Sequence, residues 1–168
     1  MTLPIRTETA ADGAAIETLT ASAFRHAPHS SHTEQFIVNA LRRAGQLTVS
    51  LVAEEGSEIL GHVAISPVSI SSGATGWYGL GPISVSPGRQ GEGIGSRLME
   101  AALADLRQLG AEGCVLLGDP AYYQRFGFDV RPGLELPGVP PEYFQAISFS
   151  GRWPTGQVSY HEAFDATE

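Results

Sequence analysis

The stretch that decides the fold runs from residue 79 to residue 109 and reads GLGPISVSPGRQGEGIGSRLMEAALADLRQL. Residues 80–85 are mostly apolar, and Pro87 and Gly88 follow them, which predicts a buried strand. A helical stripe comes next, with apolar residues three or four apart at Ile94, Leu98, Ala102, Leu106 and Leu109. Gly110 stands where a helix-ending glycine belongs. The stretch therefore predicts a strand, a glycine-rich loop and a long helix.

The loop between this strand and helix contains glycine at alternate positions, Gly91, Gly93 and Gly95. Glycine allows a ligand to approach the backbone closely. The first N–H groups of a helix have no partner within the helix, and the helix dipole favours negative charge beside them. With Arg89 and Arg97 on its flanks, the loop predicts a phosphate-binding site rather than a tight turn alone.

Two familiar phosphate-binding motifs fit this loop poorly. A nucleotide P-loop needs a lysine followed by serine or threonine, whereas Gly95 is followed by Ser96 and Arg97. A dinucleotide fingerprint needs glycine or alanine at the place of Ser96, and its glycines begin closer to the strand. The pattern Gln-x-x-Gly-x-Gly, formed by Gln90, Gly93 and Gly95, instead resembles the acyl-CoA-binding motif of the GNAT superfamily of N-acetyltransferases.

Composition limits the classes of protein that fit. A chain of 168 residues with 42% hydrophobic and 17% charged residues suits one soluble globular domain. The net charge of −8 argues against nucleic-acid binding and against anionic membranes, and it weakly favours cationic substrates such as amines. No apolar run approaches the roughly 18 residues that span a membrane. Without a signal-like start, and with Cys114 as the single cysteine, we expect a cytoplasmic protein in which Cys114 is a small buried hydrophobe.

The rest of the chain predicts a mixed α/β (α+β) sheet. A strand ends near residue 6, a Thr9–Asp12 capping box starts a first helix, and Ile16, Leu19 and Thr20 lie on its inner face. Further elements are a helix at 33–44, antiparallel strands at 48–54, 59–70 and 77–85, and a strand at 114–117 parallel to the third of these. Residues 131–141 should be irregular, 142–149 a short helix turning into strand, and 157–164 a last strand at a sheet edge.

A loop at 25–32 contains three histidines, His26, His29 and His32, at a spacing of three residues. On a helix this spacing would suit a metal ion. Pro28 interrupts the run, however, and no cysteine or acidic ligand accompanies it. We therefore expect a solvated loop that faces the substrate, and no metal site.

A second motif follows the strand at 114–117. The run from Tyr123 to Phe128, YQRFGF, stands in a short helix that Asp119 and Pro120 begin and Gly127 ends. It looks like the tyrosine-containing helix that follows the next strand of GNAT proteins. The runs GLGPISVSP and LGDPAYYQRFGF are together similar to a bacterial group of predicted N-acetyltransferases of undefined substrate. The resemblance covers about residues 4–130.

The resemblance implies one domain over residues 1–168, with the order β-α-α-β-β-β-α-β-α-β and two central parallel strands that splay apart. It implies acetyl-CoA as co-substrate, no metal, and an amine as acceptor. The pantetheine arm would lie along Ile83, Ser84 and Val85, where a backbone N–H could polarise the thioester carbonyl. The pyrophosphate and its surroundings would involve Gln90, Gly91, Glu92, Gly93, Ile94, Gly95 and Ser96.

The resemblance also assigns catalytic roles. Tyr123 matches the tyrosine that lies near the thioester sulfur and would act as general acid to the departing thiolate. Tyr122 is adjacent and points about 100° away on a helix, so we expect it to pack between helix and strand. The general base stays open, with His62, Glu54 and Asp119 as candidates.

Several alternatives remain at this point. The protein could transfer another acyl group, or bind acyl-CoA as a sensor without catalysis, or be a nucleotide-binding βαβ protein. The acceptor could be a small-molecule amine or a protein amine. The oligomeric state is also open, with a homodimer among the alternatives.

Overall fold

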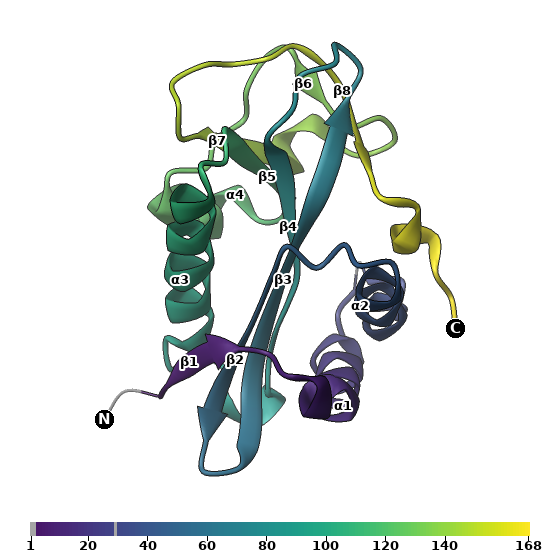
Figure 1. Ribbon diagram of the computed structural model, residues 1–168, viewed down its shortest axis with the longest axis vertical. Coiled ribbons are helices and arrows are strands. Elements are labelled where there is room, and N and C mark those ends of the chain that lie inside the picture. Colours follow the sequence, from purple (N-terminus) through teal and green to yellow (C-terminus); the bar gives the residue numbers. More distant parts are fainter. Residues whose placement is uncertain (1–2, 29) are drawn as a thin grey trace.

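The computed structural model describes residues 3–28 and 30–168, so His29 of the predicted histidine loop lies outside the described residues. The helices are α1 (Gly13–Phe24), α2 (Glu34–Arg43), α3 (Ile94–Leu109) and α4 (Pro120–Tyr123). The strands are β1 (Ile5–Thr7), β2 (Val49–Glu55), β3 (Glu58–Ile70), β4 (Trp77–Val85), β5 (Gly113–Leu117), β6 (Leu134–Glu135), β7 (Phe144–Ser148) and β8 (Gly156–Tyr160). One sheet runs through the molecule, with α3 on one face and α1 and α2 on the other (Figure 1).

The main sheet has the strand order β1-β2-β3-β4-β5-β7. The strands β2, β3 and β4 form the predicted antiparallel meander. The strand β5 is parallel to β4, which confirms the βαβ unit around α3. The strand β7 lies in the segment predicted to turn from helix into strand, and it pairs with the far side of β5 in antiparallel orientation.

The two central parallel strands part from each other, as the resemblance implied. Pairing between β4 and β5 joins Trp77–Gly79 to Gly113–Val115. Beyond Gly79, β4 continues to Val85 with β3 as its partner. The last residues of β5, Leu116 and Leu117, pair with β7. A gap therefore opens between the carboxyl-terminal halves of β4 and β5.

The helix α3 covers one face of the sheet with the predicted stripe, except at its end. Ile94, Leu98, Ala102 and Leu106 are buried, and they pack with sheet residues such as Val63 and Leu116 in one core. The prediction for Leu109 is wrong, because its side chain is 58% exposed. The buried length of the helix ends one turn earlier, and the chain turns away through Gly110, whose φ is +81°.

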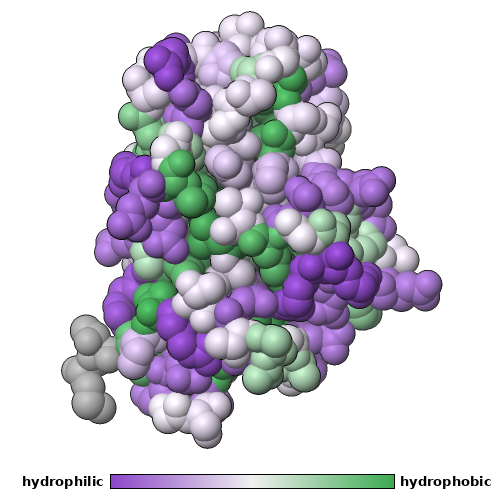
Figure 2. Space-filling view, in the orientation of Figure 1, coloured by the Kyte–Doolittle hydropathy of each residue, from purple (hydrophilic) through white to green (hydrophobic). Residues whose placement is uncertain are grey.

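The opposite face of the sheet is covered by α1 and α2. As predicted, Ile16, Leu19 and Thr20 of α1 are buried. The predicted capping interaction is also present, because the carboxylate of Asp12 accepts the N–H of Thr9 at 2.7 Å. Figure 2 shows a narrow band of hydrophobic residues along the molecule with hydrophilic residues on both sides. The helices thus direct their polar sides outward.

The carboxyl-terminal third differs most from prediction. The segment 131–141 is irregular except for β6, which is parallel to β8. The predicted last strand ends at Tyr160 rather than at residue 164, because the ring of His161 accepts the N–H of Ala163 at 3.0 Å and starts a tight turn. The prediction of a sheet edge is wrong, since β8 lies between β6 and the end of β3.

Two further features are the surroundings of the single cysteine and the apolar character of the helices. Cys114 is fully buried, as predicted, and burial raises the pKa of its thiol. Within residues 3–28 and 30–168, no helix combines the length and the apolar character needed to cross a membrane.

Candidate active site

The glycine-rich loop forms the amino-terminal end of α3. Gly91 and Gly93 have φ values of +80° and +86°, a backbone conformation that residues other than glycine rarely adopt. The N–H of Arg97 donates to the carbonyl of Gly93 at 3.1 Å and begins the hydrogen bonds of the helix. The N–H groups that precede it in the first turn are therefore available to a ligand. This geometry is the one predicted for an anion site.

A cavity of about 330 Å³ lies at this end of the helix. Seven of the predicted cofactor-binding residues line it, together with Arg89 and two side chains from beyond β5: Val85, Arg89, Gln90, Gly91, Gly93, Ile94, Gly95, Ser96, Tyr122 and Arg125. The predicted Glu92 forms an ion pair instead, with Arg89 at 3.0 Å. The cavity thus joins the end of β4, the loop and α4.

The backbone N–H and C=O groups of the predicted strand residues Ile83, Ser84 and Val85 point in two opposite directions. The N–H of Ser86 donates to the carbonyl of Leu60 at 2.8 Å, so Ser86 pairs toward β3. Because polar groups alternate along an antiparallel strand, Ser84 also pairs toward β3, opposite His62. The N–H and C=O groups of Ile83 and Val85 consequently face the gap that β5 leaves open.

Two arginines bring positive charge to the cavity, and their contacts differ: Arg89 is paired with carboxylates, whereas Arg125 lies over an aromatic ring. The guanidinium of Arg89 is held by Glu55 and Glu92, both at 3.0 Å, and these hydrogen bonds raise its pKa. Arg125 instead lies over the ring of Tyr122, 4.4 Å from its centroid. Arg125 was missed in the sequence, because the short helix that carries it shows no charge pattern pointing to the loop.

Tyr122 lines the cavity, which corrects its expected packing role. Its hydroxyl lies 3.4 Å from the Oγ of Ser96 in the first turn of α3. A Cβ at Gly95 would lie 3.3 Å from the same hydroxyl, so glycine allows this close approach. The rings of Tyr122 and Tyr123 meet edge to face, with centroids 4.8 Å apart and planes at 89°, so the two side chains stay in contact.

Tyr123 lies on the α3 face of the sheet, packed against the core of that face. Its position depends on Gly118, because a Cβ there would stand 2.3 Å from the Tyr123 ring. Asp119 starts α4 as predicted, accepting the N–H of Ala121 at 2.9 Å. Burial raises the pKa of Tyr123 to about 12, so the phenol keeps its proton at neutral pH. A protonated phenol can donate a proton.

None of the three candidate bases is free at the gap. His62 is fully buried, its ring lies 2.8 Å from the Oγ of Ser50, and burial lowers its pKa to about 4. Glu54 forms an ion pair with Arg6 at 2.8 Å. Asp119 is engaged as the helix cap.

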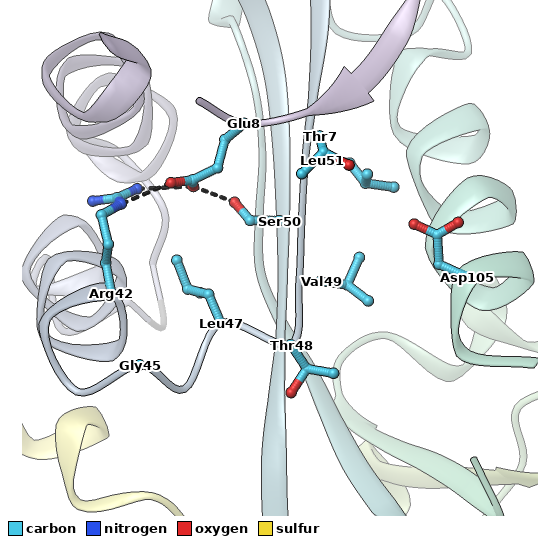
Figure 3. A pocket seen from close by; sticks show the side chains of 10 residues that line it. All are labelled: Thr7, Glu8, Arg42, Gly45, Leu47, Thr48, Val49, Ser50, Leu51 and Asp105. Atoms are coloured by element: carbon cyan, nitrogen blue, oxygen red, sulfur yellow. Dashed lines mark hydrogen bonds and ion pairs between the residues drawn. The ribbon is translucent and has the colours of Figure 1, made fainter. Parts of the chain in front are cut away.

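A second cavity, of about 320 Å³, lies where β1 ends beside β2 (Figure 3). In it the carboxylate of Glu8 accepts the Nε and Nη2 groups of Arg42 at 2.8 and 2.9 Å and also the hydroxyl of Ser50. Asp105 of α3 stands across the strand from this cluster (Figure 3). The charges of Glu8 and Arg42 neutralise each other as an ion pair. The residues that line this cavity are not those of the glycine-rich loop.

The sequence and the fold are similar to those of known proteins. The model of the Acetyltransferase (GNAT) family matches residues 14–128. The chain belongs to the GNAT family. Its fold is that of GNAT acyltransferases, with a mostly antiparallel sheet and one parallel pair in the main sheet. Within the described residues, no group of three or more His, Cys, Asp or Glu side chains is placed to hold a metal ion.

Several GNAT relatives are similar over nearly the whole chain. The uncharacterized N-acetyltransferase YhbS of Escherichia coli K12 is 34% identical, over 96% of this chain and 98% of its own. A GNAT family acetyltransferase from Brucella melitensis, solved in complex with acetyl-CoA, is 51% identical over 97% of this chain and 98% of its own, with a TM-score of 0.87. The Escherichia coli YhbS structure, solved with CoA, is 32% identical over 100% and 94%, with a TM-score of 0.89.

Proposed function

We propose that this protein is an N-acetyltransferase that moves the acetyl group of acetyl-CoA to an amine by direct attack. The observation that carries the proposal is the gap beside β4. There, the backbone groups of Ile83 and Val85 point into the gap, and the amino-terminal end of α3 lies at its mouth. The complexes of the two similar proteins with acetyl-CoA and CoA support acetyl-CoA as the ligand.

The gap and its mouth suit two neighbouring parts of the donor. The pantetheine arm is an extended chain with amide groups, so it can pair with Ile83 and Val85 as an additional strand would. The pyrophosphate is an anion, which suits the N–H groups of the first turn of α3 and the guanidinium of Arg125. The N–H of Ile83 or Val85 can also donate to the thioester oxygen as negative charge develops there.

The reaction forms one bond and breaks one. The lone pair of a neutral amine attacks the thioester carbon, a C–N bond forms, and the C–S bond then breaks with both electrons moving to sulfur. The nitrogen loses one proton to water. Tyr123 gives its phenolic proton to the leaving thiolate and regains a proton from solvent. The raised pKa of Tyr123 keeps that proton available near neutral pH.

A direct assay tests this function. The purified protein and acetyl-CoA are mixed with a panel of amines, comprising benzylamine, spermidine, kanamycin and a lysine-containing peptide, and thiol release and acetylated product are measured together. We expect at least one amine to be acetylated in equal amount to the thiol released. Binding of acetyl-CoA without acetylation of any amine would instead support a sensor, and thiol release without acetylated product would indicate hydrolysis.

A further inference from the structure

An apolar side chain is left uncovered where β5 ends beside the gap. Leu117, the last residue of β5, is 43% exposed. Its neighbours fix its direction, because Leu116 packs in the core beneath α3 and Val115 packs in the cluster on the other face. Side chains alternate along a strand. Leu117 therefore points to the same face as Val115, opposite α3 and Tyr123.

Other exposed apolar side chains belong to the same region. Four large hydrophobic residues are exposed in the part of the chain that the structure describes, and three of them lie around β5 and β7: Leu117, Val130 and Tyr143. The carbonyl of Tyr143 accepts the N–H of Gly118, the residue after Leu117, at 3.0 Å. Val130 follows Asp129, which pairs with the other side of β7. Exposed apolar residues thus lie on both sides of β7, and one of them is next to the gap.

A cavity of about 390 Å³ lies on the side of β7 away from the gap. The segment 130–141 surrounds it, and the side chains that line it are mostly aliphatic, aromatic or proline, among them Leu134, Leu136, Val139 and Phe144. Its two charged residues, Arg131 and Glu135, have opposite signs. A concave, mostly apolar site of this size is typical of small-molecule binding.

Phe144 connects the gap to this cavity. It is the cross-strand partner of Leu117 in the register of β5 and β7, so the two side chains share a face and lie about 5 Å apart at their Cβ atoms. Phe144 packs in the cluster opposite α3 and also lines the cavity. Because neighbouring strands are about 4.8 Å apart, the cavity lies within about 10 Å of β5. An alkyl chain can span that distance.

The charges at the cavity do not favour a second cation in the ligand. Arg131 is exposed, and its guanidinium lies over the ring of Trp153, 4.3 Å from the centroid. An ammonium group that approached Glu135 would therefore also meet the positive charge of Arg131. The apolar side chains are left as the main source of attraction.

We propose that the acceptor is a primary amine with an apolar body, which covers Leu117 and Phe144 and ends in the cavity formed by the segment 130–141. This inference rests on the proposed acetyltransferase function and names the substrate class for that site. Burial of apolar surface supplies the binding free energy. The nitrogen then approaches the thioester from the face opposite Tyr123, so that the attacking amine and the acid that protonates the thiolate lie on different sides of the sheet.

A series of amines tests the substrate class. Butylamine, hexylamine and octylamine differ only in length, and octamethylenediamine matches octylamine except for the second ammonium group at its far end. We expect kcat/KM to rise about 3-fold per methylene group from butylamine to octylamine, because each added group is buried. The diamine should be acetylated no better than butylamine. Equal kcat/KM for octylamine and the diamine, or no rise with length, would overturn the proposal.

Matched variants locate the apolar body. Leu117→Ser and Leu109→Ser each replace an exposed leucine, at the end of β5 and at the end of α3 respectively. Leu117→Ser should lower kcat/KM for octylamine about 5- to 10-fold, reduce the preference for octylamine over the diamine, and leave the KM for acetyl-CoA unchanged. Leu109→Ser should change none of these. Equal kcat/KM for octylamine in the two variants would overturn the proposal.

Methyl NMR separates this inference from the proposed function. N-octylacetamide has the apolar body but no nucleophilic amine, so its binding to the protein in the presence of CoA does not depend on catalysis. We expect chemical-shift changes at the methyl groups of Leu117 and Val139 and none at Leu109. If wild type acetylates no amine, the proposed function fails, and these shifts still decide whether the apolar site exists. Unchanged shifts at Leu117 and Val139 at the solubility limit of N-octylacetamide would overturn the inference.

Discussion

The two faces of the sheet around the parted strands differ in chemistry. On the α3 face, backbone N–H groups, Arg125 and Tyr122 surround a loop suited to an anion, and Tyr123 lies nearby in α4. On the face of α1, α2 and β8, the neutral hydroxyls of Ser66 and Tyr160 lie beside β4. The groups that suit a highly charged donor therefore lie on the α3 face, whereas the hydroxyls on the other face are buried.

One strand serves both faces because its side chains alternate. Leu80, Ile83 and Val85 of β4 pack toward α3, whereas Gly79 faces Tyr160 and Ser84 lies opposite His62. The backbone between them faces the gap at every second residue. A single extended segment can thus present a free backbone edge to a donor arm while its two faces contact two different cores.

The largest effect should follow from a charge placed on the donor side. Gly93→Glu adds a carboxylate beside the proposed pyrophosphate, and repulsion at about 4 Å should weaken acetyl-CoA binding by about 100-fold or more. Calorimetry measures the Kd. Gly73→Glu is the matched control, because Gly73 has φ +89° and open space like Gly93, with φ +86°, but lies in the β3–β4 turn. Equal affinity of Gly93→Glu and wild type would contradict the site.

The two adjacent tyrosines should respond differently to loss of the hydroxyl. Tyr123→Phe should lower kcat by about 100-fold, the effect of a lost general acid, and leave the Kd for acetyl-CoA unchanged. Tyr122→Phe should weaken acetyl-CoA binding, because this hydroxyl stands by Ser96, and should largely preserve kcat. Steady-state kinetics and calorimetry on both variants measure this. The assignment fails if Tyr123→Phe keeps the kcat of wild type.

A smaller effect should appear in the stability of the α1–α2 face. His62 is neutral in the folded protein down to about pH 4, where its lowered pKa lies, but takes up a proton near pH 6.5 when unfolded. The unfolded state therefore binds more protons between these values, and stability falls as pH decreases from 6.5 to 4, by about 3 kcal/mol from this group.

Denaturant unfolding at several pH values measures this loss of stability. His62→Gln should reduce the pH dependence in that window, whereas His26→Gln, at an exposed loop residue, should not. An equal pH dependence in wild type and His62→Gln would show that another group is responsible.

The sequence was most informative where contacts are local. The block from β4 to α3 could be predicted because the strand, the positive-φ glycines and the helical stripe are each set by neighbouring residues. The parting of β4 and β5 came from the resemblance, and the structure confirms it. The prediction that Leu109 is part of the buried stripe was wrong, because the spacing of apolar residues does not show where the surface beneath a helix ends.

The carboxyl-terminal part was least predictable, for a physical reason. Tyr160 meets Gly79 only because β8 pairs with the end of β3, and a two-residue strand completes that arrangement. Such distant pairing leaves no periodic signal in the sequence. Tyr122 presents a related problem, since helical geometry separates it from Tyr123 by about 100° but does not tell which of the two faces the loop.

Amide hydrogen exchange, followed residue by residue by NMR, tests the central claim most directly. The claim is that acetyl-CoA binds as an added strand along the free edge of β4. With saturating acetyl-CoA, exchange at the N–H groups of Ile83 and Val85 should slow, whereas Ser84, already paired toward β3, should change little. Unchanged exchange at Ile83 and Val85 in the saturated complex would contradict the account.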